Sequence, residues 1–119
     1  MRFVTQEEAQ KAANRGKRAA IKSARRKWRA FWQCNEQEFR KAKPQIMGCT
    51  CALCWRYRLW DRACPFSEEP QEPCEGSCSA SFGKARDAYD YDYWKKDSVS
   101  FAEFQAAAKE VWQDLGKLL

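Results

Sequence analysis

The cysteines between residues 49 and 78 are the residues whose type and spacing best suit metal chemistry in this 119-residue chain. Cys51 and Cys54 form a C-x2-C pair, in which two intervening residues let the backbone turn so that both sulfurs face one ion. Cys64 and Cys74 follow at intervals that loops can close. Because zinc prefers four ligands in a tetrahedron, we predict a structural zinc site held by these four thiolates.

The ligand set has alternatives, because the chain carries more cysteines than one ion needs. Cys49 can replace Cys51 in a C-x4-C arrangement, and Cys78 can replace Cys74. The chain has no histidine, so a zinc site here must use thiolates or borrow a carboxylate. An iron–sulfur cluster is the second interpretation, because thiolates also hold clusters and a Cys-Pro pair occurs beside them. The third is reduced, buried cysteine without metal, which is also what we expect of Cys34.

The N-terminal segment has no apolar run of the kind that a signal peptide needs. No window of the sequence is apolar over the length of a membrane span. We therefore expect a cytoplasmic protein without membrane association. Thiols stay reduced in that compartment, and seven cysteines leave at least one unpaired, so metal binding is favoured over disulfides.

Residue types that catalysis requires are scarce. There is no histidine for general-base work, no glycine-rich phosphate loop, and no Ser or Cys nucleophile with a base partner. Asp87, Asp90 and Asp92 are clustered carboxylates near aromatic residues, but two-metal chemistry needs such groups on a rigid scaffold. The sequence predicts a turn around these residues. Metal-dependent catalysis is therefore the weakest alternative, and we expect a protein that is not an enzyme.

Positive charge is concentrated near the N-terminus. Residues 1–43 hold 13 basic and 4 acidic residues, a net charge of +9, whereas residues 44–119 hold 9 and 12, a net charge of −3. A basic helix face can follow a phosphate backbone, with binding that weakens as salt rises. It can also dock on an acidic protein surface or be merely solvated. The expected binding residues on this face are Arg15, Arg18, Lys22, Arg25, Arg26 and Arg29.

Residues 55–62 interleave aromatic and basic side chains directly after the cysteine pair. Stacking platforms for single strands have this composition, which adds Arg56 and Arg58 to the expected binding residues. As a helix, however, the segment would turn Leu53, Tyr57 and Trp60 inward and the arginines outward. We favour this core interpretation, because a small domain needs its aromatic residues for packing.

Helix signals frame the basic segment. Thr5 and Glu8 fit a capping box, so a helix should begin there and continue with Gly16 as its one weak point. Large apolar residues recur at spacings of three and four only from residue 21 onward. We therefore expect residues 21–33 to pack on the core and residues 6–20 to project as a basic arm.

The C-terminal helix is the best-marked element. Ser100 and Glu103 fit a second capping box, and Val99 and Phe104 fit a hydrophobic staple. Apolar residues then recur at helical spacing, which marks one core face: Phe101, Phe104, Ala108, Val111, Leu115 and Leu118.

The remaining segments are less regular. We expect a short helix or a loop at residues 35–43, an exposed loop at residues 67–73, and a short strand or a packed turn at residues 89–94.

These elements predict a single domain of the mainly α class, with two long amphipathic helices stapled by a central cysteine/zinc knuckle and little or no β-structure. The two helices should pack through Trp28, Phe31, Phe104, Val111 and Leu115. The expected regions are a basic helical arm (1–20), a packed helix and linker (21–43), the cysteine knuckle region (44–82), and an aromatic turn with the C-terminal helix (83–119).

The arrangement resembles a group of small, mostly uncharacterised proteins encoded by bacteriophages. They share an amphipathic helix with a tryptophan, a C-x-L-C knuckle, a Cys-Pro pair, a cysteine followed by Gly-Thr or Gly-Ser, and a closing helix. The corresponding features here are Trp28, Cys51–Cys54, Cys64-Pro65, Cys74–Ser77 and residues 101–118. The resemblance covers residues 21–119 and leaves out the basic arm. Such proteins usually have proline after Gly-Thr, where this chain has Cys78, so the fourth ligand stays open.

The resemblance implies a phage accessory protein in a bacterial cytoplasm, without a known activity. With the charge pattern, it predicts a non-enzymatic, zinc-stabilised protein that binds nucleic acid or a nucleoprotein through its basic N-terminal helix. The alternative is an inhibitor of a host or anti-phage defence protein that acts by protein–protein binding.

Overall fold

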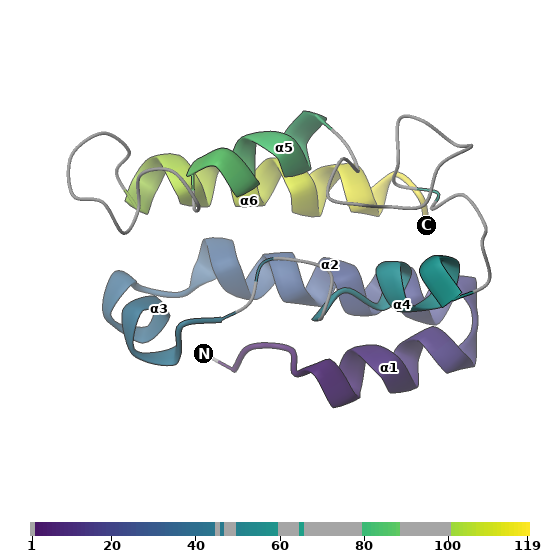
Figure 1. Ribbon diagram of the computed structural model, residues 1–119. Helices are drawn as coiled ribbons and strands as arrows, with labels where there is room; N and C mark the ends of the chain where they lie inside the picture. Colours follow the sequence, from purple (N-terminus) through teal and green to yellow (C-terminus); the bar gives the residue numbers. More distant parts are fainter. Residues whose placement is uncertain (1, 45, 47–49, 60–64, 66–79, 89–100) are drawn as a thin grey trace.

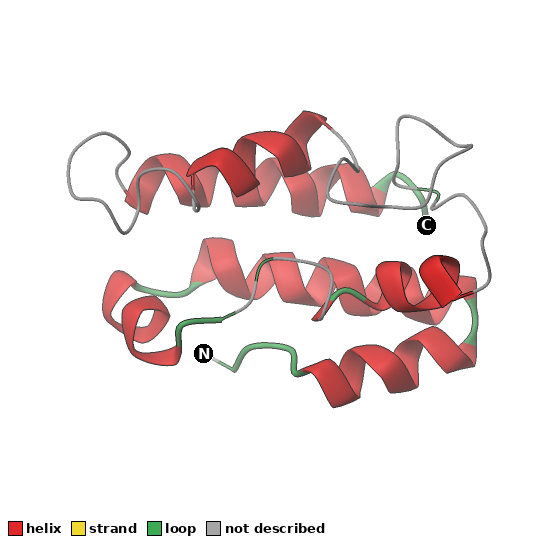
Figure 2. Cartoon of the chain, in the orientation of Figure 1, coloured by secondary structure: helices red, strands yellow, loops and turns green. Residues whose placement is uncertain are grey.

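The computed structural model describes residues 2–44, 46, 50–59, 65, 80–88 and 101–119 (Figure 1). Over these residues the chain is helical and contains no strand (Figure 2), which confirms the mainly α class. The helices are α1 (Gln6–Arg15), α2 (Lys17–Gln33), α3 (Glu36–Ala42), α4 (Ala52–Leu59), α5 (Ala80–Asp87) and α6 (Phe101–Gly116). α2 is central, with α6 and α5 on one side and α1 and α4 on the other (Figure 1).

The pairing of α2 with α6 forms the core that the apolar spacing predicts. Trp28 and Phe31 of α2 are buried, as are Phe104, Val111 and Leu115 of α6. The rings of Phe31 and Phe104 lie 6.1 Å apart between centroids. The predicted packing of these two long amphipathic helices is therefore confirmed.

A side chain of α6 also completes the end of α2. The amide nitrogen of Gln105 donates to the carbonyl oxygens of Phe31 at 3.3 Å and of Cys34 at 2.6 Å. The last carbonyls of a helix have no partner within the helix, so this contact gives two carbonyls at the end of α2 a partner and holds α6 along α2.

The long N-terminal helix is divided at Gly16, contrary to the expectation of a continuous, projecting arm. Gly16 has φ 132° and ψ 177°, a conformation that glycine adopts readily because it lacks a Cβ. The chain turns there, and α1 folds back on α2 and α4. Ala9 and Ala13 are buried in this contact, so small side chains let the helices approach closely and residues 6–15 do not project.

Of residues 35–43, for which the sequence predicts a short helix or a loop, Glu36–Ala42 form α3. The Asn35 side chain accepts from the Glu38 backbone N–H at 2.8 Å, and the Glu38 carboxylate accepts from the Asn35 N–H at 3.2 Å. This is a capping box with asparagine in the cap position. The helix ends at Ala42, and its C-cap residue Lys43 has a left-handed φ of 46°, directly before a proline that cannot continue the helix.

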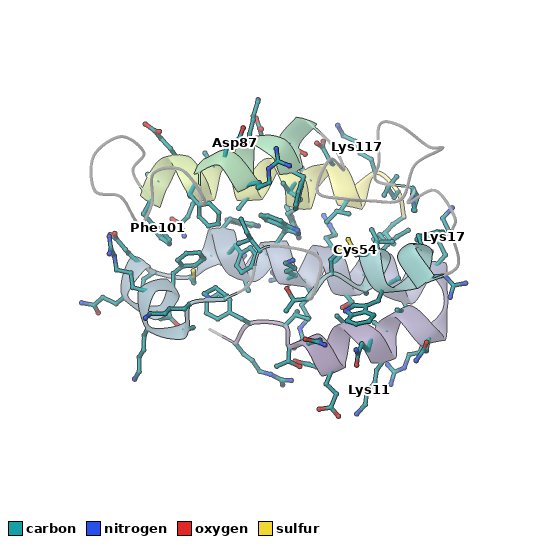
Figure 3. All side chains as sticks on the ribbon, in the orientation of Figure 1. Lys11, Lys17, Cys54, Asp87, Phe101 and Lys117 are labelled. Carbon is teal, nitrogen blue, oxygen red and sulfur yellow. The ribbon has the colours of Figure 1, made fainter. Side chains whose placement is uncertain are left out.

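Phe39 joins α3 to the rest of the molecule. It is fully buried, and its ring lies 5.1 Å from that of Phe104, 5.5 Å from Phe101 and 5.9 Å from Phe31. Figure 3 shows Phe101 at the end of α6 that faces α3. One buried side chain therefore anchors this short helix.

α5 is an element that the sequence pattern does not predict. Its Phe82 and Ala85 are buried, and the Phe82 ring meets the Trp28 ring edge-on at 5.8 Å. The helix is short, and two buried apolar side chains are too few to establish a helical period.

Several predicted features lie outside the described residues. These are the loop at 67–73, the aromatic segment at 89–94, and the cap and staple residues Val99 and Ser100. No helix in the described part of the chain combines the length and apolar character that crossing a membrane requires.

Candidate functional site

A hollow of about 490 Å³ lies between α1 and α2, and basic side chains dominate its walls. Its lining combines four cations, one acid and three small residues: Lys11, Arg15, Lys22, Arg26, Glu8, Ala12, Ala19 and Ser23. The small side chains leave room between the helices, and the long cationic ones line it. The surface is therefore concave and positively charged.

Helical spacing and the turn at Gly16 together explain why these residues meet. Lys11 and Arg15 are one turn apart on α1, and Lys22 and Arg26 are one turn apart on α2, so each pair shares a helix face. Because the chain reverses at Gly16, the two faces turn toward each other. Three of the sequence-predicted residues, Arg15, Lys22 and Arg26, are brought together in this way.

Glu8 is the acid of the hollow, and its two oxygens have different partners. Oε1 accepts from the Thr5 backbone N–H and hydroxyl, each at 3.2 Å. Oε2 accepts from Arg2 at 2.5 Å and from Arg26 at 3.3 Å. The backbone hydrogen bond from Thr5, and then the hydrogen bond from Arg2, lower the pKa of Glu8 to about 2. It is therefore ionised at neutral pH.

The other cations of the hollow are less neutralised. Lys11 pairs with Glu7 at 3.4 Å, and both side chains are largely exposed, so the pair contributes little. Over the residues that the structure describes, Arg15 and Lys22 are exposed and have no ion-pair partner. The hollow therefore keeps a net positive charge that can attract an anion.

Arg18 and Arg29 are exposed on α2 but do not line this hollow. Arg18 borders a smaller one of about 280 Å³ between the start of α2 and the end of the chain. Arg29 donates to the Gln33 side chain at 3.2 Å on its own helix.

Arg25 binds α6 instead of facing solvent. Its Nε donates to the Trp112 carbonyl at 3.1 Å, and its guanidinium carbon lies 4.0 Å from the Trp112 ring centroid. A Cβ at Gly116 would come within 2.8 Å of the same guanidinium, so glycine at that position leaves space for it. Arg25 thus holds the last turns of α6 against α2, where a cation is also favoured by the helix dipole.

Replacing Arg25 by alanine should therefore lower the free energy of unfolding by about 1–2 kcal/mol, through loss of the hydrogen bond and the cation–π contact. Arg29→Ala, which removes an exposed arginine one turn away, should change it by no more than about 0.5 kcal/mol. Urea unfolding of both variants measures the difference. Equal effects would show that Arg25 does not hold α6.

Arg56 is also used within the fold, so the expectation that it faces outward is wrong. Its Nη1 donates to the Ala13 carbonyl at 2.9 Å in a partly buried contact, which ties α4 to α1. Leu53 is buried, in agreement with the core interpretation, whereas Tyr57 is only partly so. The side chain of Arg58, like Trp60, lies outside what the structure describes.

Lys27 is the buried member of the basic stretch. It is 1% exposed, and its Nζ donates to the Ile46 carbonyl at 2.8 Å. The ammonium therefore attaches the segment after α3 to α2 and is not available to a partner.

The described part of the cysteine region contains the C-x2-C pair. Cys51 directly precedes α4, and Cys54 lies in its first turn, where the Trp55 N–H donates to the Cys51 carbonyl at 3.2 Å. Cys54 is buried and Cys51 partly buried. The C-x2-C pair, whose spacing is typical of zinc ligands, therefore lies at the start of one helix.

The other predicted ligands, Cys64 and Cys74, and the alternates Cys49 and Cys78, lie outside the described residues. Over the residues that are described, no group of three potential ligands occurs. The zinc site therefore stays a prediction.

Cys34 is buried, as expected for a small residue behind Phe31. Its thiol donates to the Phe31 carbonyl at 3.4 Å. Burial, and then the nearby charge of Glu38, raise the pKa of this thiol to about 11. It is therefore protonated at neutral pH, which suits a packing residue and not a nucleophile.

Asp87 is the described member of the aspartate cluster. It is exposed at the end of α5 and pairs with Arg86 at 3.5 Å, and Figure 3 shows it on the side of α5 away from α2. Asp90 and Asp92 lie outside the described residues.

No family model, curated protein or solved structure matches this chain. Over the residues that the structure describes, the protein is helical and has a concave, basic surface between α1 and α2.

Proposed function

We propose that this chain is a non-enzymatic protein that binds nucleic acid by its phosphate backbone, through the hollow between α1 and α2. The observation that carries the proposal is the convergence of four cations on one concavity that contains a single acid. Guanidinium and ammonium groups are the usual phosphate ligands, and contacts to phosphate supply most sequence-independent affinity.

The composition of the hollow supports backbone binding over base reading. Its lining contains no asparagine or glutamine, which are the side chains that recognise adenine through paired hydrogen bonds. Arginine and lysine can both contact guanine, but they are also the side chains that most often bind phosphate oxygens, whatever the base sequence. We expect similar affinity for unrelated sequences.

The exposed surface gives less support to a protein partner. Among the large apolar side chains that the structure describes, Leu119 is the exposed one. Stable protein interfaces usually contain a central cluster of aromatic or aliphatic anchors. An inhibitor of a host or defence protein would have to bind mainly through charge, so it remains the second candidate.

The resemblance to phage-encoded proteins places this activity, as a proposal, in an accessory protein that acts in a bacterial cytoplasm. Zinc would be structural in it, bound by Cys51 and Cys54 with Cys64 and Cys74. The metal would hold the chain that follows α4 to the start of that helix, and α4 in turn contacts α1 and α2.

The purified protein should accordingly contain about one zinc ion per chain and lose cooperative thermal unfolding when a strong chelator removes it. Cys51→Ser together with Cys54→Ser should abolish zinc binding, whereas Cys34→Ala should keep it. Elemental analysis and thermal denaturation measure both. A metal-free chain that unfolds with the same cooperativity would rule out the structural zinc.

The function itself is tested by titrating labelled duplexes of two unrelated sequences at several salt concentrations. We expect similar affinities for both duplexes and a steep, linear fall of log K with log salt. A pull-down from bacterial lysate, with and without nuclease, separates the two candidates. Capture that survives nuclease and moderate salt, without direct duplex binding, would favour the protein inhibitor.

A further inference from the structure

The ion pair between Glu8 and Arg26 lies inside the proposed binding surface. Glu8 is the one acid among the residues that line the hollow. Its side chain is 25% exposed and that of Arg26 is 52% exposed, with 3.3 Å between Oε2 and Nη2. The carboxylate therefore binds a part of the Arg26 guanidinium that an external anion can also reach.

A phosphate oxygen and a carboxylate oxygen make the same kind of charge-assisted hydrogen bond to a guanidinium. An exposed ion pair of this sort contributes at most about 1 kcal/mol, so a polyanion held by three neighbouring cations can replace it. Glu8 itself cannot leave easily, because its Oε1 is part of the capping box of α1. Its charge stays in the hollow while Arg26 changes partner.

We propose that Glu8 is a built-in competitor for phosphate: its carboxylate holds Arg26 in the free protein, and a bound phosphodiester takes its place. This inference rests on the proposed function. It adds that Glu8 makes the hollow bind nucleic acid more weakly than its four cations would bind it without that acid. Glu8 thus determines affinity through Arg26, as a positioning residue and not as a direct ligand.

Glu8→Gln tests this with little change to the fold. Glutamine also serves in capping boxes, so its amide oxygen can keep the two hydrogen bonds from Thr5. Its amide nitrogen would replace Oε2, and as a donor it cannot accept from Arg2 or Arg26. The variant should bind a mixed-sequence duplex about threefold more tightly at low salt, and log K should fall more steeply with log salt, by up to about one unit of slope.

Glu38→Gln is the matched control. Glu38 has the same capping-box position on α3, and its substitution changes the net charge equally, but it does not line the hollow. It should leave duplex affinity within experimental error.

In an Arg26→Gln background the gain from Glu8→Gln should shrink to roughly half or less, because coupled residues are not additive. Circular dichroism melts confirm that each variant is folded.

The outcomes separate the inference from the function on which it rests. Salt-dependent binding by the wild type, with no gain in Glu8→Gln, would overturn the competitor role and leave the proposed function intact. An equal gain in Glu38→Gln, or an undiminished gain in the Arg26→Gln background, would also overturn it, since net charge alone would then explain the effect. No duplex binding by wild type or by Glu8→Gln would overturn both.

Discussion

Replacing Phe39 by alanine should lower the free energy of unfolding by about 3–5 kcal/mol, the usual effect of removing a buried phenylalanine side chain. Phe39 is 0% exposed and contacts three phenylalanine rings from α2 and α6. It is also the buried residue of α3, so its loss both leaves a cavity and detaches that helix. Since small domains are stable by only about 5–15 kcal/mol, the variant should be close to unfolding at physiological temperature.

Phe101→Ala provides the control for this prediction. It removes the same side chain from the same cluster at a position that is only partly buried, so its effect should be roughly half as large. Denaturant midpoints of the two variants, compared at equal m-values, give the difference. If Phe39→Ala were no more destabilising than Phe101→Ala, the cluster would not be the anchor of α3.

The apolar faces of α2 and α6, which form the core, could be predicted from the sequence. Large apolar residues recur at helical spacing on α2 and α6, and burial of such a stripe outweighs weak local preferences. The cap of α3 was equally present in the sequence, as Asn35 followed by Glu38. The sequence nevertheless does not distinguish a helix from a loop there, because a single apolar residue, Phe39, gives no period.

The turn at Gly16 could not be predicted from local signals. One glycine inside a helix costs only about 1 kcal/mol relative to alanine, so a continuous helix and a hairpin are nearly balanced locally. The balance is decided by contacts with α2 and α4, which bury Ala9 and Ala13. Alanine is a strong helix former that occurs on exposed as well as on buried helix faces, so its pattern does not reveal that contact.

The same limit applies to the candidate site. Charge density identified the cations, but adjacent residues point about 100° apart on a helix. Arg25 is therefore directed to α6 and Arg26 to the hollow. Which of the two serves the fold and which faces a partner depends on where α6 and α1 lie. The sequence predicts Glu8 only as a capping residue, because its ion pair with Arg26 forms only when α1 folds back on α2 at Gly16.

Neutralising the hollow should have the largest effect on function. The triple variant Arg15→Gln, Lys22→Gln and Arg26→Gln removes three of its four cations, and each lost phosphate contact should reduce the salt slope by about 0.9. Affinity for a mixed-sequence duplex should then fall by on the order of 10²- to 10³-fold at about 50 mM salt. All three side chains are exposed, so the fold should be preserved.

A second triple variant tests whether the cations of the hollow or the net charge of the chain cause the binding. Lys41→Gln, Lys43→Gln and Lys84→Gln remove the same charge from exposed positions on or beside α3 and α5, and none of them lines the hollow. The net charge of the chain falls equally in both variants, but only the first triple variant removes cations from the hollow itself. The control should weaken binding by no more than about threefold and leave the salt slope almost unchanged. Equal losses in the two variants would mean that the chain attracts nucleic acid by its overall charge and that the hairpin between α1 and α2 is not its binding site.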